Sequence, residues 1–146
     1  MPVQQSIRER ILIAMLARLK TLGTVQKESV YRDRAVPFLR EESPAISITW
    51  KEEPTQLRGN TIYRRDLQIE VTIVVRGDEP TSLIDPIINE VHSTIMSDPT
   101  FDGIASQTIG IDSTMEVDSA DGDVGELKAT YVVTYHTPSN DLSKSL

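Results

Sequence analysis

Two histidines, His92 and His136, are the side chains in this sequence that most readily exchange protons near neutral pH. Neither has a second histidine at the spacing of a metal-binding helix, such as His-x-x-x-His. His92 borders an apolar helical stripe, and His136 stands near the end of a strand-like segment. We therefore interpret both as ordinary structural or surface residues.

A cluster of acidic residues could indicate calcium, which prefers several oxygen ligands close together. It consists of Asp118, Asp121, Asp123 and Glu126. The spacing departs from that of an EF-hand loop, and DSADGDVG is rich in the Asp and Gly that favour a turn. The pattern therefore predicts a hairpin turn rather than an ion site, and no metal or other cofactor is expected.

Other catalytic signatures are missing from the sequence. It has no G-x-S-x-G elbow, Walker loop or dinucleotide fingerprint. It has no cysteine, which excludes disulfides, thiolate metal sites and a cysteine nucleophile. Carboxylates are numerous, but nothing in the sequence favours any particular pair for acid and base catalysis. The sequence therefore predicts a protein that is not an enzyme.

Charge is distributed unevenly along the chain. The net charge of −7 disfavours specific binding to nucleic acid. Residues 1–76 hold 13 Lys and Arg against 9 Asp and Glu, a net charge of +4, whereas residues 77–146 hold 2 against 13, a net charge of −11. One interpretation is two solvated surfaces of different composition. The other is a subunit with two opposite flanks, which favours head-to-tail association.

The length of 146 residues is typical of one domain, which we expect to span 1–146 with a flexible tail over 138–146. The N-terminal MPVQQSIRER lacks the pattern of a secretion signal, and no segment approaches the ~20 apolar residues of a membrane span. We therefore expect a soluble, unsecreted protein with no membrane partner.

Helical periodicity marks two segments. Ser6 followed by Glu9 predicts a capping box, and the apolar spacing that follows predicts a helix to about Leu22, with Gly23 as its end. A second helix is predicted over 81–98, with Pro86 near its first turn.

Strand-like alternation marks five further segments. A short strand is predicted over 28–31 and a clearer one over 45–50, followed by a polar loop over 51–60. The strongest signal is 61–77, where Leu67, Ile69, Val71, Ile73 and Val75 share one face. The last two strands are predicted over 107–117 and 126–137.

The element order is therefore α-β-β-β-α-β-β. Two amphipathic helices suffice to cover one face of a sheet. The predicted fold class is α+β, a two-layer sandwich in which two helices pack on one face of a mixed or antiparallel sheet of about four to five strands.

The order of elements and five stretches of sequence together resemble the tail-terminator proteins of tailed bacteriophages, of the minor tail protein U type. The resemblance extends from about residue 7 to residue 138. The stretches are IRERILIAMLARLKTL, SVYRDRAVPFLREESPAISITWKEEP, RRDLQIEVTIVVRG, IMSDPTFDGIA and TYVVTYHTP.

The resemblance implies a structural protein that forms a hexameric ring at the head-proximal end of a phage or prophage tail. Such a ring stops polymerisation of the tail tube and offers a surface to the head-tail connector proteins. It implies a place in the virion tail, and in the cytoplasm of the bacterial host during assembly. Loops at the sheet would contact other subunits or partners, and the residues we expect there are Arg32, Arg34, Arg40, Glu41, Glu42, Arg58, Arg64, Arg65, Asp121 and Asp123.

Two alternatives stay open at this point. A related neck or head-completion protein would bind the connector rather than the tube. A small hydrolase would use exposed carboxylates, and it would show a deep pocket with convergent acidic groups of shifted pKa.

Overall fold

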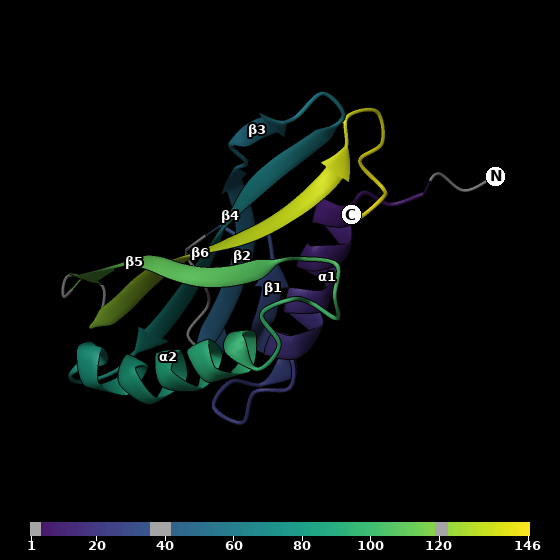
Figure 1. Ribbon diagram of the computed structural model, residues 1–146. Coiled ribbons are helices and arrows are strands. Elements are labelled where there is room, and N and C mark those ends of the chain that lie inside the picture. The colour runs from purple at the N-terminus through teal and green to yellow at the C-terminus, as the bar shows by residue number, and fades with distance from the viewer. Residues whose placement is uncertain (1–3, 36–41, 119–122) are drawn as a thin grey trace.

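The computed structural model describes residues 4–35, 42–118 and 123–146 of the chain. It contains two α-helices and one six-stranded mixed sheet, which confirms the predicted α+β class (Figure 1). The helices are α1 (Ile7–Leu19) and α2 (Pro80–Met96), and a short 3-10 turn covers Lys27–Ser29. The strands are β1 (Val30–Arg32), β2 (Ala45–Glu52), β3 (Thr55–Arg58), β4 (Ile62–Arg76), β5 (Gln107–Asp118) and β6 (Val124–Pro138).

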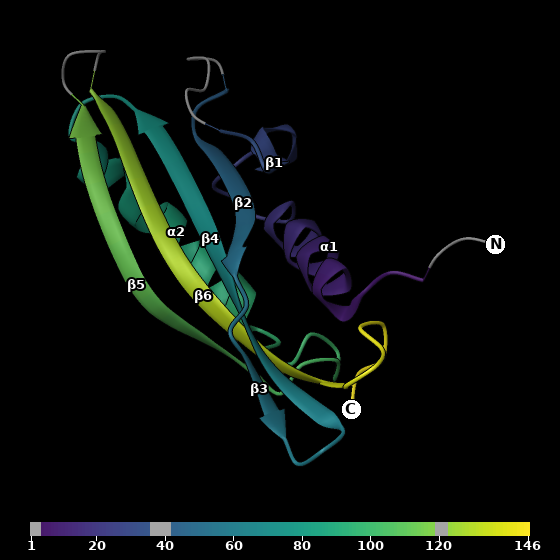
Figure 2. The same cartoon turned by 90° about the horizontal axis from the view of Figure 1, so that it is seen from above.

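The sheet is built around the two long strands β4 and β6. The strand order is β1-β2-β4-β6-β5, and β3 pairs with β4 beyond the end of β2. Only β1 and β2 run parallel, whereas the other neighbours are antiparallel. Figure 2 shows β5 along one edge of the sheet and the β3–β4 hairpin extending from its lower end.

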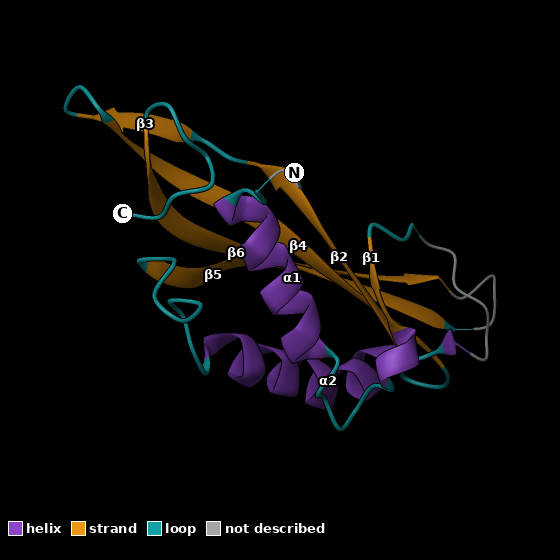
Figure 3. Cartoon of the chain, turned by 90° about the vertical axis from the view of Figure 1, so that its right-hand side faces the viewer, coloured by secondary structure: helices purple, strands orange, loops and turns teal. Residues whose placement is uncertain are grey.

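Both helices cover the same face of the sheet, as predicted. Alternate residues of β4, from Leu67 to Val75, form one buried cluster with the apolar faces of both helices and with alternate residues of β6. Figure 3 shows the two helices together on one side of the strands. This burial follows the alternation that the sequence shows, since successive side chains in a strand point to opposite faces.

The first helix begins as predicted but ends earlier. The hydroxyl of Ser6 accepts a hydrogen bond from the Glu9 backbone N–H at 3.1 Å. Half of the capping box is thus present, whereas the Glu9 carboxylate pairs with Arg32 instead. The helix ends at Leu19 because the next turn tightens, and the N–H of Leu22 bonds to the Leu19 carbonyl.

The prediction that Pro86 lies near the first turn of the second helix was wrong. Pro80 takes the first helical position, and Pro86 lies inside the helix on its exposed side. Since proline lacks an N–H, the helix omits one backbone hydrogen bond there, and solvent can satisfy the free carbonyl.

The sheet has one strand more than the sequence indicates. Residues 55–58, predicted as part of a polar loop, pair with β4 as β3, from Thr55 opposite Arg65 to Arg58 opposite Ile62. All four residues of β3 are exposed, so no apolar alternation marks the strand. Its pairing with β4, rather than burial of its own side chains, holds the strand in place.

Residues 139–146 lie against the body of the molecule (Figure 1). The carbonyl of Leu142 accepts a hydrogen bond from the first helical N–H, that of Ile7, at 2.9 Å. The N–H of Leu146 donates to the His136 carbonyl at 3.0 Å, and the Ser145 hydroxyl donates to the Ile104 carbonyl at 2.8 Å. The flexibility expected for this tail stays a prediction.

Candidate assembly surfaces

The arginines of the first predicted loop pair within the chain. Arg32 at the end of β1 makes a two-pronged ion pair with Glu9, at 2.6 and 2.8 Å. Arg34 makes a second one with Glu42, at 2.7 and 2.8 Å. Two parallel N–H···O bonds fix a guanidinium more firmly than one. These arginines therefore hold the segment against α1 and against itself, and their contact with a partner stays a prediction.

Tyr31 completes the second of these ion pairs. Its hydroxyl donates to Glu42 at 2.7 Å, and the guanidinium of Arg34 lies 4.7 Å from the centre of its ring. This bond to a carboxylate raises the pKa of Tyr31 above its usual value. Arg40 and Glu41 lie outside the described residues, as does Asp121 of the second predicted site.

The remaining arginines gather on the β3–β4 hairpin. Arg64 pairs with Asp66 on its own strand at 3.2 Å, and Arg65 donates to the Thr137 hydroxyl at 3.0 Å. Arg58, at the end of β3, makes no ion pair with any residue that the structure describes, and it is exposed. Of the three predicted hairpin arginines, it is the one most available to a partner.

A buried carboxylate anchors this hairpin to the rest of the molecule. The side chain of Glu53 is 6% exposed and lies 3.3 Å from Arg8 of α1 and 3.5 Å from Arg65 of β4. Glu53 also accepts a hydrogen bond from the Tyr135 hydroxyl at 2.5 Å, and the Arg8 guanidinium lies 4.4 Å from the centre of the Trp50 ring. The cluster joins α1, β4 and β6 at the base of the hairpin.

The acidic half of the chain contributes the opposite edge of the sheet. Strand β5 contains Asp112, Glu116 and Asp118 and no Lys or Arg. It pairs with β6 up to Asp118 opposite Val124, as a hairpin requires, although residues 119–122 of the predicted turn lie outside the described part. Asp123 adopts a left-handed backbone with φ of 56°, and its carbonyl accepts a bond from the Gly77 N–H.

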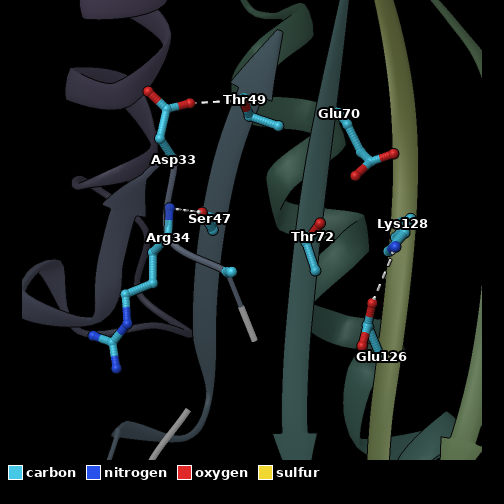
Figure 4. Close-up of a pocket in the computed structure, with 9 residues that line it drawn as sticks. Asp33, Arg34, Ser47, Thr49, Glu70, Thr72, Glu126 and Lys128 are labelled. Atoms are coloured by element: carbon cyan, nitrogen blue, oxygen red, sulfur yellow. Dashed lines mark hydrogen bonds and ion pairs between the residues drawn. The ribbon is translucent and has the colours of Figure 1, made fainter. Parts of the chain in front are cut away.

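The face of the sheet opposite the helices is polar. A shallow hollow of about 190 Å³ opens over β2, β4 and β6, with Glu70, Thr72, Glu126 and Lys128 along it (Figure 4). Lys128 pairs with Glu126 at 3.5 Å. Figure 4 shows side chains of these strands on the face of the sheet, with the Arg34 side chain turned away from them. Acidic and basic groups alternate here, so no strong anion site results.

The two histidines bond to neighbouring hydroxyls. His92 Nδ1 lies 2.8 Å from the Tyr131 hydroxyl, and His136 Nδ1 lies 3.1 Å from the Ser106 hydroxyl. Burial raises the pKa of Tyr131 to about 12, so the phenol stays protonated.

Over residues 4–35, 42–118 and 123–146, no three His, Asp or Glu side chains gather in a way that could hold a metal ion. Neither of the two described helices is long and apolar enough to span a membrane.

Several carboxylates have lowered pKa values. The hydrogen bond from Arg32 lowers the pKa of Glu9. The Glu90 carboxylate accepts three hydrogen bonds, from the Thr24 hydroxyl at 2.7 Å, the Thr24 N–H at 2.9 Å and the Gly23 N–H at 3.1 Å. These bonds lower the pKa of Glu90. The backbone N–H of Asp102 and the hydroxyl of Thr100 lower the pKa of Asp98. A lowered pKa keeps these groups ionised, which suits ion pairs and loop closure rather than proton donation.

We expect stability to fall in acid. Because the folded pKa of Glu90 is lower than the unfolded one, its contribution is present above the unfolded pKa and is lost as pH falls through the folded value. The melting temperature should be nearly constant between about pH 7 and 6 and fall steadily below about pH 4.5. Glu90→Gln should reduce this acid dependence, measured by thermal unfolding across pH. Glu52→Gln, at an exposed position, is the control. If Glu90→Gln left the pH profile as unchanged as the control does, Glu90 would not be a source of the acid dependence.

The fold has a counterpart among solved structures. A chain of the structure described as "Virion of native gene transfer agent (GTA) particle" superposes with a TM-score of 0.52 at 8% sequence identity, over 90% of this chain and 92% of that chain. The chain shares the fold of a gene transfer agent virion component. No protein-family model and no curated protein matches the sequence.

Sequence reasoning missed two features of these surfaces. The Glu53 cluster escaped it because Glu53 stands in a polar run beside Pro54, where nothing marks one carboxylate as buried. The exposed apolar residues of β5, Ile109 and Ile111, look like core positions in the alternating pattern. Ile109 pairs with Val132, on the face of the sheet away from the helices, and Ile111 lies in the bulge between Gly110 and Asp112 on the edge strand, so both are outside the core.

Proposed function

We propose that the chain is a structural protein of a phage-like virion and, within it, a tail terminator. Six copies form a ring at the head-proximal end of the tail, stop polymerisation of the tube and offer a surface to the connector. The observation that carries the proposal is the shared fold with a gene transfer agent virion component over nine-tenths of both chains. The sequence resemblance to tail terminators supports the finer assignment.

The distribution of charge agrees with a ring. Basic side chains lie on α1 and the β3–β4 hairpin, whereas β5 and α2 carry Asp and Glu and no Lys or Arg. Contacts between two different surfaces of neighbouring copies close into a ring when the rotation allows it. The polar face of the sheet carries Glu70 and Glu126 beside Lys128, a mixed set of charges that would not hold a phosphate backbone tightly. DNA passing such a ring would not be gripped.

The proposal assigns the chain no catalytic role. The carboxylates with lowered pKa values serve ion pairs and loops, and the hollows over the sheet and beside β5 lie on open surfaces. The partners it assigns are other copies of the chain, the tail tube protein and the head-tail connector. The place of action is the virion tail, reached from the host cytoplasm during assembly.

Binding to purified assemblies tests the proposal. A tagged chain is incubated separately with assembled tail tubes and with isolated head connectors, and the bound fraction is recovered by sedimentation. We expect the chain to sediment with tail tubes in the absence of connectors, and less so at about 0.5 M salt, where surface charges are screened. Sedimentation with connectors alone would contradict the tail-terminator assignment and favour a neck or head-completion protein.

A further inference from the structure

Strand β5 leaves a hollow beside the second helix. Among the described strands β5 pairs only with β6, and its register shifts between Gly110 and Asp112, so that Ile111 bulges from the strand. A cavity of about 250 Å³ opens at this point, between the bulge and Ile88 and His92 of α2. A bulge on an edge strand commonly redirects side chains and ends regular pairing.

Gly110 provides part of the space in this hollow. A methyl group added at Gly110 would lie 3.4 Å from the buried Tyr131 ring and 3.7 Å from the exposed His92 ring, so the missing side chain leaves room beside His92. Ile111, which lines the hollow, is 46% exposed, and Ile109 on the same strand is 45% exposed. A long edge strand with exposed isoleucines readily pairs with another chain unless something covers it.

An exposed leucine, Leu57, lies on a different edge of the sheet from β5. Leu57 on β3 is 54% exposed, although it lies in a paired strand. β3 lies on the side of β4 away from β6, whereas β5 lies beyond β6 (Figure 2). The hollow and Leu57 therefore lie on different edges of the sheet within one copy.

The charges of the two edges are complementary. Residues 55–65 contain three arginines and no acid, whereas β5 contains three acids and no Lys or Arg. Each edge carries a charge that makes no hydrogen bond or ion pair with a described residue: Arg58 at the end of β3, beside Leu57, and Asp112 beside the hollow. Opposite charges beside the two apolar surfaces select the partner and fix how the two strands align.

We propose that the occupant of the β5 hollow is the β3–β4 hairpin of a second copy of this chain. Leu57 enters the cavity between α2 and β5, and Arg58 pairs with Asp112. Because the two surfaces differ, the contact is head-to-tail and repeats from copy to copy. The inference rests on the proposed ring, for which it specifies the contact, and it would hold for a ring of any number of copies.

Directed cross-linking tests this contact, because the chain has no cysteine of its own. Two single-cysteine chains, Leu57→Cys and Ser113→Cys, are mixed at high concentration and oxidised. Ser113 lines the hollow and is exposed. We expect a disulfide-linked heterodimer. The matched control pairs Ser113→Cys with Ile13→Cys, a residue of α1 that is 43% exposed. Equal cross-linking in the two mixtures, or none in either, would overturn the proposal.

Charge reversal gives a second measurement on the same contact. Arg58→Glu and Asp112→Arg should each weaken self-association by about tenfold, because like charges would meet, and the two variants mixed together should associate as the original chain does. If the mixture did not associate as the original chain does, the contact would be contradicted.

The proposed function and the proposed contact can fail independently. Cross-linking without binding to tail tubes would remove the tail-terminator function and keep the contact, whereas tube binding that no hairpin variant weakens would remove the contact and keep the function.

Discussion

Glu53→Ala lowers the free energy of unfolding by about 3 kcal/mol, since breaking a buried ion pair leaves its partner charges without compensation. The Glu53 carboxylate is 6% exposed and contacts Arg8, Arg65 and the Tyr135 hydroxyl. Removing it leaves the Arg65 guanidinium, 13% exposed, beside a buried phenol with one acceptor fewer. Denaturant unfolding measures the loss, as a lower midpoint at an unchanged slope.

Two variants of neighbouring chemistry serve as controls for Glu53. Glu52→Ala removes a carboxylate at an exposed position and should change stability by less than about 0.5 kcal/mol. Glu53→Gln keeps the shape and one acceptor oxygen but loses the charge, so its cost should lie between the other two. A cost for Glu53→Ala no larger than that for Glu52→Ala would show that the cluster does not hold the hairpin to α1.

Gly125→Ala destabilises the fold by about 2 kcal/mol, because overpacking forces rigid neighbours apart. A methyl group at position 125 of β6 would lie 2.6 Å from Cβ of Pro80 and 2.9 Å from the Met115 methyl group. The methionine side chain can move, whereas the Pro80 ring begins α2 and is buried. The substitution therefore displaces the start of the helix from the sheet, and thermal unfolding should show a lower midpoint.

The control for this prediction is Gly110→Ala, on the neighbouring strand β5. The nearest atom to its added methyl group would lie 3.4 Å away, in the Tyr131 ring, so we expect a change below about 1 kcal/mol. If both substitutions had the same cost, the clash with Pro80 would not be the source of the destabilisation, because the lost backbone freedom of the unfolded chain favours folding. That result would contradict the close packing of α2 on β6.

The fold class could be predicted because its strongest elements carry unambiguous periodicity. The alternation from Leu67 to Val75 fixes which face of β4 is buried, and two amphipathic helices suffice to cover that face. Strand β3 could not be predicted, since all of its side chains are exposed and its pairing with β4 depends on the hairpin geometry. The end of α1 at Leu19 depends on a local tightening of the backbone, which residue types do not reveal.

The candidate surfaces were less accessible to sequence reasoning. The opposite net charges of residues 1–76 and 77–146 predict that two surfaces of the subunit differ in charge. They do not show that Arg32 and Arg34 are held by Glu9 and Glu42 within the chain. A charge-reversing substitution of Arg34 would therefore disturb an internal ion pair as well as any interface. Arg58, which has no such partner among the described residues, is the cleaner probe of assembly.

Imaging tail tubes in the presence of the chain tests the ring most directly. Negatively stained tubes incubated with the protein should carry a six-fold ring at one end only, with a mass near six times 16.3 kDa, and should no longer lengthen when tube protein is added. Tubes with bare ends that continue to grow, beside a chain that remains a 16.3 kDa monomer at every concentration, would contradict the proposed function.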